Sequence, residues 1–352
     1  MIRKNLLRRF AFASLLTTLP LGAAPAFAQT RTLAEIASYQ GADRTERLIE
    51  GAKKEGTFTL YSSTAPEDMN PVIDAFKKKY GIDVQFWRSS SDNIVQRAVA
   101  ENRAGRCLVD AFTSVAAELE ALQREKLLYA VKTPLTAELM PQSLRPHGEW
   151  IATRLNIFAA AYNTNLIKKE EVPKSYEDLK DPKWKGRLGI EVGDSDWFSA
   201  IVPKMGQEKA LKLFKEIALT NGFSYRKGHT LLANLVAAGE VPLALTTYNY
   251  KPEQLKKAGA PIEPLYLSPL IALPNGAAVS RCAAHPNAAV LFYDFMVGEA
   301  QEILAKRDFV PTNLKLRTLP AGMELTFVDP AELLDHSEMW TELWEKTILR
   351  PQ

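Results

Sequence analysis

The sequence is poor in the residues that build most metal and redox sites. It has two cysteines, Cys107 and Cys282, and four histidines that lie far apart in the chain. There is no C-x-x-C pair, no H-E-x-x-H, no G-x-S-x-G and no glycine-rich phosphate loop. These absences leave no constellation typical of an enzyme. We therefore expect a protein that is not an enzyme and has no cofactor, with a secreted enzyme of irregular site as an alternative.

Long apolar runs are missing after the N-terminus, so no later segment is expected to span a membrane. Residues 1–28 combine four basic residues, the apolar stretch FAFASLLTTLPLGAA and the ending Ala26-Phe27-Ala28, which has the small-x-small pattern of a signal-peptidase site. We interpret them as a cleaved signal peptide, which predicts secretion to the periplasm. The pair Arg8-Arg9 leaves the export route, general or twin-arginine, open.

The charge balance is nearly neutral once the signal peptide is removed. The chain then carries 40 basic and 41 acidic residues, which gives no support to nucleic-acid binding. The remaining chain, from residue 29 to 352, is longer than one ordinary core usually accommodates. We expect two α/β lobes.

Hydroxyl residues end three successive predicted strands, over 57–63, 83–91 and 108–114, and an amphipathic helix follows each strand. The carboxyl ends of parallel strands gather at one edge of an α/β sheet, where ligands bind against helix N-termini. Each serine could instead simply cap a helix. As ligand-binding candidates in this half we select Ser62, Ser63, Ser90 and Ser114.

The second half offers further candidates at strand ends. Asp194 and Trp197 stand where a strand passes into a helix, and we expect Trp197 to face a cleft. Tyr248 and Tyr250 follow an apolar run, and in extended chain both side chains would point to the same side. We interpret His229, near the start of a helix, as a surface or capping residue.

Arginines near these segments are candidates for binding an anion. Arg88 and Arg226 are selected, and Arg154 is a further candidate. The alternative for each is a solvated surface charge.

Several segments, in order, resemble the periplasmic solute-binding proteins of ABC transporters, in the branch that contains the ferric-ion-binding proteins. They are YNTNLI followed by VPKSYEDLKDPKWKGRLGI, then AAGEVPLAL, then AHPNAAVLFYDFMVGEAQEILAKRDFVP. The resemblance implies an α/β, two-lobed type II periplasmic-binding-protein fold with crossing hinge strands. It divides the chain into lobe one (29–158), lobe two (159–273) and a return to lobe one (274–352), with the final helices packing on lobe one.

The resemblance also bears on the ligand. The ferric-binding relatives carry an adjacent tyrosine pair at the strand end, but here Asn249 separates Tyr248 from Tyr250, and only Tyr250 falls on a family tyrosine. We expect a small organic or phosphorylated anion as the cargo. The alternative is Fe3+, held by Tyr248, Tyr250 and a carboxylate such as Asp194.

The resemblance further implies an ABC permease as partner, a monomeric binding protein and hinge closure on the ligand, with a ligand sensor for a membrane receptor as an alternative. The cysteine spacing alone leaves a disulfide and two thiols equally open. The implied topology places the strand that returns from lobe two antiparallel to the third strand of lobe one. This favours a disulfide between Cys107 and Cys282.

Overall fold

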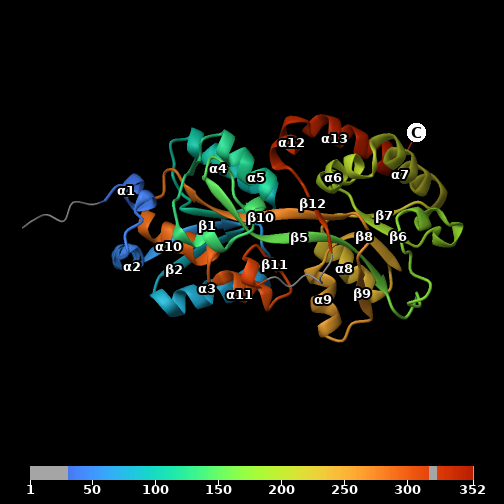
Figure 1. The fold of residues 1–352 in the computed structure, drawn as a ribbon, viewed down its shortest axis with the longest axis horizontal. Helices are drawn as coiled ribbons and strands as arrows, with labels where there is room; N and C mark the ends of the chain where they lie inside the picture. Colours follow the sequence, from blue (N-terminus) through green and yellow to red (C-terminus); the bar gives the residue numbers. More distant parts are fainter. Residues whose placement is uncertain (1–30, 317–322, 352) are drawn as a thin grey trace, which may run out of the picture. The chain divides into compact units, whose positions relative to one another are not determined.

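Two long strands, β5 (Trp150–Asn163) and β10 (Leu270–Ser280), run antiparallel to each other and are buried along their whole length (Figure 1). The structure, a computed structural model, describes residues 31–316 and 323–351. The predicted signal peptide lies outside these residues. Among the described residues, no helix has the length and apolarity needed to cross a membrane.

The other elements alternate along the chain. The remaining strands are β1 (Thr57–Ser62), β2 (Asp83–Arg88), β3 (Ala111–Val115), β4 (Leu128–Tyr129), β6 (Leu188–Glu191), β7 (Ser224–Arg226), β8 (Leu243–Tyr248), β9 (Ile262–Leu265), β11 (Val310–Pro311) and β12 (Leu325–Phe327). The helices are α1 (Leu33–Ser38), α2 (Arg44–Glu55), α3 (Pro66–Tyr80), α4 (Ser91–Arg103), α5 (Ala116–Arg124), α6 (Ser195–Met205), α7 (Gln207–Asn221), α8 (His229–Ala238), α9 (Tyr250–Lys257), α10 (Pro286–Val297), α11 (Ala300–Ala305), α12 (Pro330–Asp335) and α13 (Ser337–Trp344). Short 3-10 or π-helical segments are η1 (Pro134–Glu138), η2 (Pro141–Ser143), η3 (Glu177–Lys180), η4 (Pro182–Trp184), η5 (Leu314–Leu316) and η6 (Glu345–Leu349).

Strand β5 takes part in two sheets. The pairing path runs β2-β1-β3-β10-β5-β8-β6-β7. Up to Ile157, β5 pairs with β10 and β11, and from Phe158 on it pairs with β8 and β9. We call the strands on the β10 side the first sheet and those on the β8 side the second sheet. The change of partners lies next to the predicted boundary between residues 158 and 159, although residues from Thr32 onward form one compact unit by their contacts.

The first sheet contains the three strand–helix units that the sequence predicts. Strand β1 pairs in parallel with both β2 and β3, as expected for successive crossover units. Helix α3 begins with Pro66 in its first turn and ends before Gly81, whose φ of 75° is a left-handed cap that glycine adopts without strain. The alternation of buried strands and amphipathic helices thus determines this part of the fold.

The disulfide prediction is confirmed. Strand β10 lies antiparallel to β3, over the pairs Asn275–Val115 to Val279–Ala111. Cys107 precedes β3 and Cys282 follows β10, so the two residues meet at one end of this strand pair. Their Cα atoms are 5.8 Å apart and their sulfurs are bonded.

The predicted position of the final helices is wrong for α13 but not for α12. Helix α12 contacts α5 beside the first sheet, where Arg124 Nη1 pairs with Asp335 at 2.6 Å. Helix α13 packs against α6, which follows the second sheet, and not on the first-sheet side. Trp344 lies against Phe198 with ring centroids 5.4 Å apart, and its indole Nε1 donates a hydrogen bond of 2.8 Å to the carbonyl of Val192. Tyr225 in β7 also donates a hydrogen bond to the carbonyl of Ile348. Apolar burial against aromatic residues of the second sheet region therefore outweighs the expected packing on lobe one.

Substituting Trp344 by alanine tests this packing. The side chain is fully buried, so we expect Trp344→Ala to lower the free energy of unfolding by about 3–5 kcal/mol. Met339→Ala on the same helix is the control, because Met339 is exposed and its loss should change stability by less than about 0.5 kcal/mol. Urea denaturation measures both. Equal stabilities of the two variants would show that α13 does not pack on α6.

Candidate functional site

Serines at the ends of β1 and β3 lie side by side, as the parallel pairing of these strands predicts. Ser62 is fully buried and its hydroxyl accepts hydrogen bonds from the Thr64 amide at 3.1 Å and from the Thr113 hydroxyl at 2.6 Å. The hydroxyls of Ser63 and Ser114 are 3.4 Å apart. Ser62 thus fixes the loop after β1, and Ser63 with Ser114 forms a hydroxyl pair at the same sheet edge.

Three other candidates lie at surface or half-buried positions. Ser90 is exposed at the start of α4, where its hydrogen bond lowers the pKa of Asp92. Arg88 is exposed at the end of β2. Arg226 is half-buried and donates a hydrogen bond to the carbonyl of Tyr225. None of these contacts indicates a ligand.

The expectation that Trp197 faces a cleft is wrong. Its side chain is 1% exposed and belongs to the second sheet's core, with ring centroids 5.2 Å from Phe214 and 6.3 Å from Trp344. A large aromatic side chain buries more apolar area in such a cluster than it could at a polar cleft.

The sequence predicts that the two tyrosines lie in extended chain. This prediction is wrong, because the backbone turns between them. Asn249 has helical angles, φ −45° and ψ −41°, and Tyr250 is the first residue of α9. Asn249 forms two hydrogen bonds with β5. Its amide donates to the Ile157 carbonyl at 2.9 Å, and its side-chain oxygen accepts from the Ile157 amide at 3.0 Å. The residue between the tyrosines is therefore an anchor to β5.

The turn gives each tyrosine a different set of neighbours. Tyr248 packs on His229 and Phe158, with ring centroids 3.7 and 5.2 Å away. Tyr250 stacks on Phe309 at 4.0 Å. The two phenol rings remain 6.2 Å apart and nearly parallel. Burial raises the pKa of both phenols.

Arg154 in β5 is a buried cation that has no carboxylate partner within residues 31–316 and 323–351. The residue is 2% exposed, its Nη2 donates a hydrogen bond of 2.8 Å to the Thr64 hydroxyl, and the guanidinium lies 4.9 Å from the centre of the Phe309 ring. Its Nε and Nη1 atoms have no hydrogen-bond partner in the described part of the chain. Burial lowers the pKa of Arg154 to about 10, which still leaves the group charged at neutral pH. The nearby carboxylate of Asp68 is already paired with Arg307.

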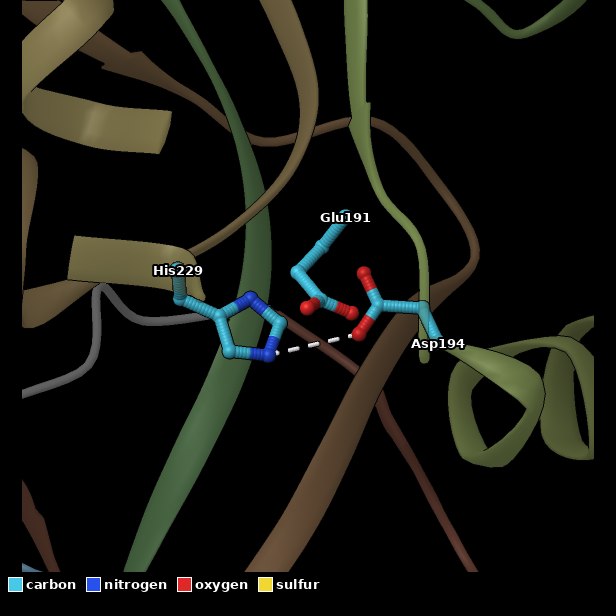
Figure 2. A group of neighbouring side chains, drawn as sticks. All are labelled: Glu191, Asp194 and His229. Atoms are coloured by element: carbon cyan, nitrogen blue, oxygen red, sulfur yellow. Dashed lines mark ion pairs between the residues drawn. The ribbon is translucent and has the colours of Figure 1, made fainter. Parts of the chain in front are cut away.

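Three other residues form a group that we call the carboxylate–histidine group: Glu191, Asp194 and His229 (Figure 2). Glu191 ends β6, Asp194 precedes α6 and His229 begins α8. One potential ligand atom from each lies within 4.8 Å of the others. His229 Nε2 is 3.3 Å from Asp194 Oδ1, which corrects the expectation of a surface or capping histidine. Among the described residues, the remaining oxygen of Asp194 and Nδ1 of His229 have no partner at hydrogen-bond geometry. Thr246 lies beside both, and its contacts partly oppose the effect of burial on the pKa values of Asp194 and His229.

Further acidic side chains lie around this group. The pKa of Asp194 is raised by burial and by the carboxylates of Asp196 and Glu191. Burial likewise raises the pKa of Asp196 to about 7 and that of Glu118 in α5 to about 8, with Asp196 contributing to the latter. Burial lowers the pKa of His229 to about 4, so its imidazole is neutral at pH 7.

Sequence reasoning did not select Glu191, Asp196, Glu118 or His229 for the site. Glu191 stands at the end of an apolar strand, the position at which the serines of the first half were recognised, and this signal could have found it. Glu118 gives no such signal, because its helix pattern is that of an ordinary amphipathic helix. His229 was recognisable only by its neighbours in space.

Two sheets joined by crossing strands, with charged side chains of unused bonding capacity at strand and helix ends, define a ligand-binding protein. The family described as bacterial extracellular solute-binding proteins matches residues 112–336, and the chain belongs to this family. Its place in the branch that contains the ferric-ion-binding proteins and its two-lobed α/β fold agree with the sequence resemblance.

The relatives cover much of the chain at low identity. The chain is 25% identical over 267 residues to iron uptake protein A1 of Synechocystis, covering 71% of this chain and 74% of that protein. It is 25% identical over 207 residues to the Fe(3+)-binding periplasmic protein of Serratia marcescens, covering 58% and 60%.

Solved structures share the fold. Iron-bound HitA from Pseudomonas aeruginosa matches with a TM-score of 0.71 and 23% identity, over 83% of this chain and 99% of that one. AfuA from Actinobacillus pleuropneumoniae, with fructose-6-phosphate bound, matches with a TM-score of 0.73 and 21% identity, over 84% and 99%. Both matches establish the two-lobed fold.

The raised pKa of Glu118 predicts a pH-dependent stability. Between the ordinary value of 4.5 and the folded value of about 8, the folded protein keeps a proton that the unfolded chain has lost. Raising the pH through this window therefore destabilises the native protein. Glu118→Gln removes the linkage, so its melting temperature relative to wild type should rise by roughly 3 °C or more between pH 5 and pH 8.5.

Differential scanning calorimetry across this pH range measures the effect. Glu240→Gln is the control, because Glu240 is exposed, and its difference from wild type should stay flat. Parallel curves for wild type and Glu118→Gln would show that Glu118 is ionised in the folded protein.

Proposed function

We propose that this chain is the extracytoplasmic substrate-binding component of an ABC importer and that it captures a small organic or phosphorylated anion. Family membership supports the solute-binding role. The observation that carries the ligand class is Arg154, a buried guanidinium with two nitrogen atoms unbonded.

The energetics of burial favour an anionic ligand at Arg154. A buried ion without a partner costs several kcal/mol, and planar carboxylate or phosphate groups match the guanidinium fork. The hydroxyl of Thr64 already orients one side of the group. Ser63 follows β1 and Ser114 is the last residue but one of β3, so their hydroxyls could supply further donors to the same kind of ligand.

Removing Arg154 tests the anion proposal. Wild-type protein stripped of ligand is titrated calorimetrically with inorganic phosphate, fructose 6-phosphate and citrate, and native mass spectrometry identifies any ligand retained from the cell. Arg154→Met should weaken the binding of the anion by roughly 30-fold or more, as expected for the loss of one buried charged hydrogen-bonded contact. The exposed Arg281→Gln is the affinity control.

The melting temperatures of two arginine variants distinguish a buried arginine that lacks an ion-pair partner from one that has one. Arg44 is also buried, but it forms an ion pair of 3.0 Å with Asp294. We expect Arg44→Met to lower the melting temperature of the ligand-stripped protein, because Asp294 then loses its partner, and Arg154→Met to preserve or raise it. Full anion affinity in Arg154→Met would contradict the proposed contact, and a wild type that binds no anion would contradict the ligand class.

Ferric iron is the second candidate cargo. The neighbouring rings of Tyr248 and Tyr250 and the names of the relatives support it. Ferric iron prefers anionic oxygen ligands, and both phenols must lose a proton against a raised pKa to bind it. If iron is the cargo, titration with ferric nitrilotriacetate produces a phenolate-to-iron absorption band that Tyr250→Phe removes and Tyr266→Phe, outside this pair, retains. A spectrum without such a band excludes this candidate.

We propose delivery to a permease in preference to signalling or turnover. Reversible, stoichiometric binding without conversion of the ligand supports a binding protein over a secreted enzyme. Capture of the purified chain by a permease in detergent, and not by a membrane receptor, supports the importer over the sensor.

A further inference from the structure

We propose that Glu191, Asp194 and His229 form a binding site for a divalent transition-metal ion of the Zn2+ or Mn2+ type. The site would bind its ion without the tyrosine hydroxyls and without Arg154. It therefore goes beyond the capture of an anion and does not depend on it.

Glu191 is held in place by backbone donors on two sides. Its Oε1 accepts a hydrogen bond of 2.8 Å from the Gly228 amide, and its Oε2 accepts one from the Gly193 amide. Gly228 has a φ of 103°, which a side chain would strain, and a Cβ at residue 193 would come within 3.1 Å of Oε2. Two glycines thus fix one carboxylate, as outer hydrogen bonds fix ligands in metal sites.

Asp194 supplies a carboxylate oxygen with unused bonding capacity. It occupies the residue before α6, yet its side chain makes no hydrogen bond to the helix amides. The side chain turns instead toward His229 and Glu191 (Figure 2). Asp194 is 2% exposed, and no described residue lies at hydrogen-bond geometry to its Oδ2. A helix-capping role therefore does not explain this residue.

His229 supplies the nitrogen ligand. It begins α8, and the helix N-terminus disfavours a positive charge on its ring. The ring packs against Tyr248 and Phe158, at centroid distances of 3.7 and 5.8 Å. A neutral imidazole in a fixed orientation is the form that coordinates metals.

The group is rich in carboxyl oxygens and lacks a basic partner among the described residues. Two carboxylates, of Glu191 and Asp194, are buried close together, with a third from Asp196 nearby. In the described part of the chain, neither lysine nor arginine forms an ion pair with any of the three. A bound divalent ion would offset the repulsion that burial imposes on them.

The ligand set indicates the class of metal. One imidazole and two carboxylates suit Zn2+, Mn2+ or Fe2+ better than Ca2+ or Mg2+, which prefer oxygen ligands only. Metal–ligand bonds of about 2 Å need donor atoms within roughly 4 Å of one another, so small side-chain rotations close the present group. Three protein ligands also leave a coordination position open to solvent or to a solute.

The test uses tag-free protein freed of metal with a chelator. Titration calorimetry with Zn2+ and with Mn2+ should show one ion per chain for at least one of them. Asp194→Asn and His229→Gln should each weaken that affinity about 10-fold or more. His285→Gln is the matched control. His285 Nδ1 also contacts an aspartate, Asp110, at 2.9 Å, but among the described residues this pair is not part of a group with a second carboxylate.

A measurement on the unmutated protein keeps the proposal testable if a variant does not fold. Addition of Co2+ should produce visible d–d absorption that saturates at one equivalent and disappears when Zn2+ is added. Substoichiometric binding, full affinity in Asp194→Asn and His229→Gln, or an equal loss in His285→Gln would overturn the proposal. A phenolate-to-iron band bears only on ferric binding and leaves this outcome unaffected.

Discussion

The antiparallel pairing of β5 with β10 is the constraint on which the rest of the structure depends. The two strands are buried along their whole length, and β5 continues past β10 into the second sheet. Arg154 lies in the part of β5 that pairs with β10. The pairing partners change at Ile157, whose backbone amide and carbonyl both form hydrogen bonds with Asn249. The same strand therefore positions the buried cation and anchors the segment that carries the two tyrosines.

This anchor determines what Tyr248 and Tyr250 can do. An uninterrupted extended chain would direct both phenols to one side. The helical turn at Asn249 instead places Tyr248 beside His229 and Tyr250 beside Phe309. The two tyrosines border different charged groups: the carboxylate–histidine group on one side and Arg154 on the other. The guanidinium of Arg154 and the carboxyl group of Asp194 are thus both buried, and each has polar atoms that make no hydrogen bond to the described residues.

The sequence contains enough information for the local part of this arrangement. Strand–helix alternation and the cap at Gly81 predict the parallel strands β1, β2 and β3, and the family resemblance predicts the disulfide between Cys107 and Cys282. These features follow from neighbours along the chain or from a shared topology. Ser63 and Ser114 were located for the same reason, since parallel strand ends meet at one sheet edge.

The residues whose surroundings the sequence does not predict are those positioned by contacts between segments distant in the chain. The sequence places Trp197 at a strand end and so predicts that it faces a cleft. It does not show that Trp197 and Trp344 pack in the same cluster. The hydrogen bond between Asn249 and Ile157 joins residues 92 positions apart, and no local sequence pattern predicts it. The role of His229 likewise depends on Asp194, which reaches it from another helix.

The unbalanced charges cannot be removed by a simple rearrangement of side chains. Glu191 accepts hydrogen bonds from the backbone amides of Gly193 and Gly228, so rotating its carboxylate away would leave those amides unsatisfied. Arg154 is bonded to Thr64 and packed on Phe309, so its guanidinium is held in place as well. When both partners of an electrostatic conflict are fixed, the unfavourable free energy persists in the ligand-free protein. A ligand that supplies the missing charge then gains affinity at a small cost of reorganising the site.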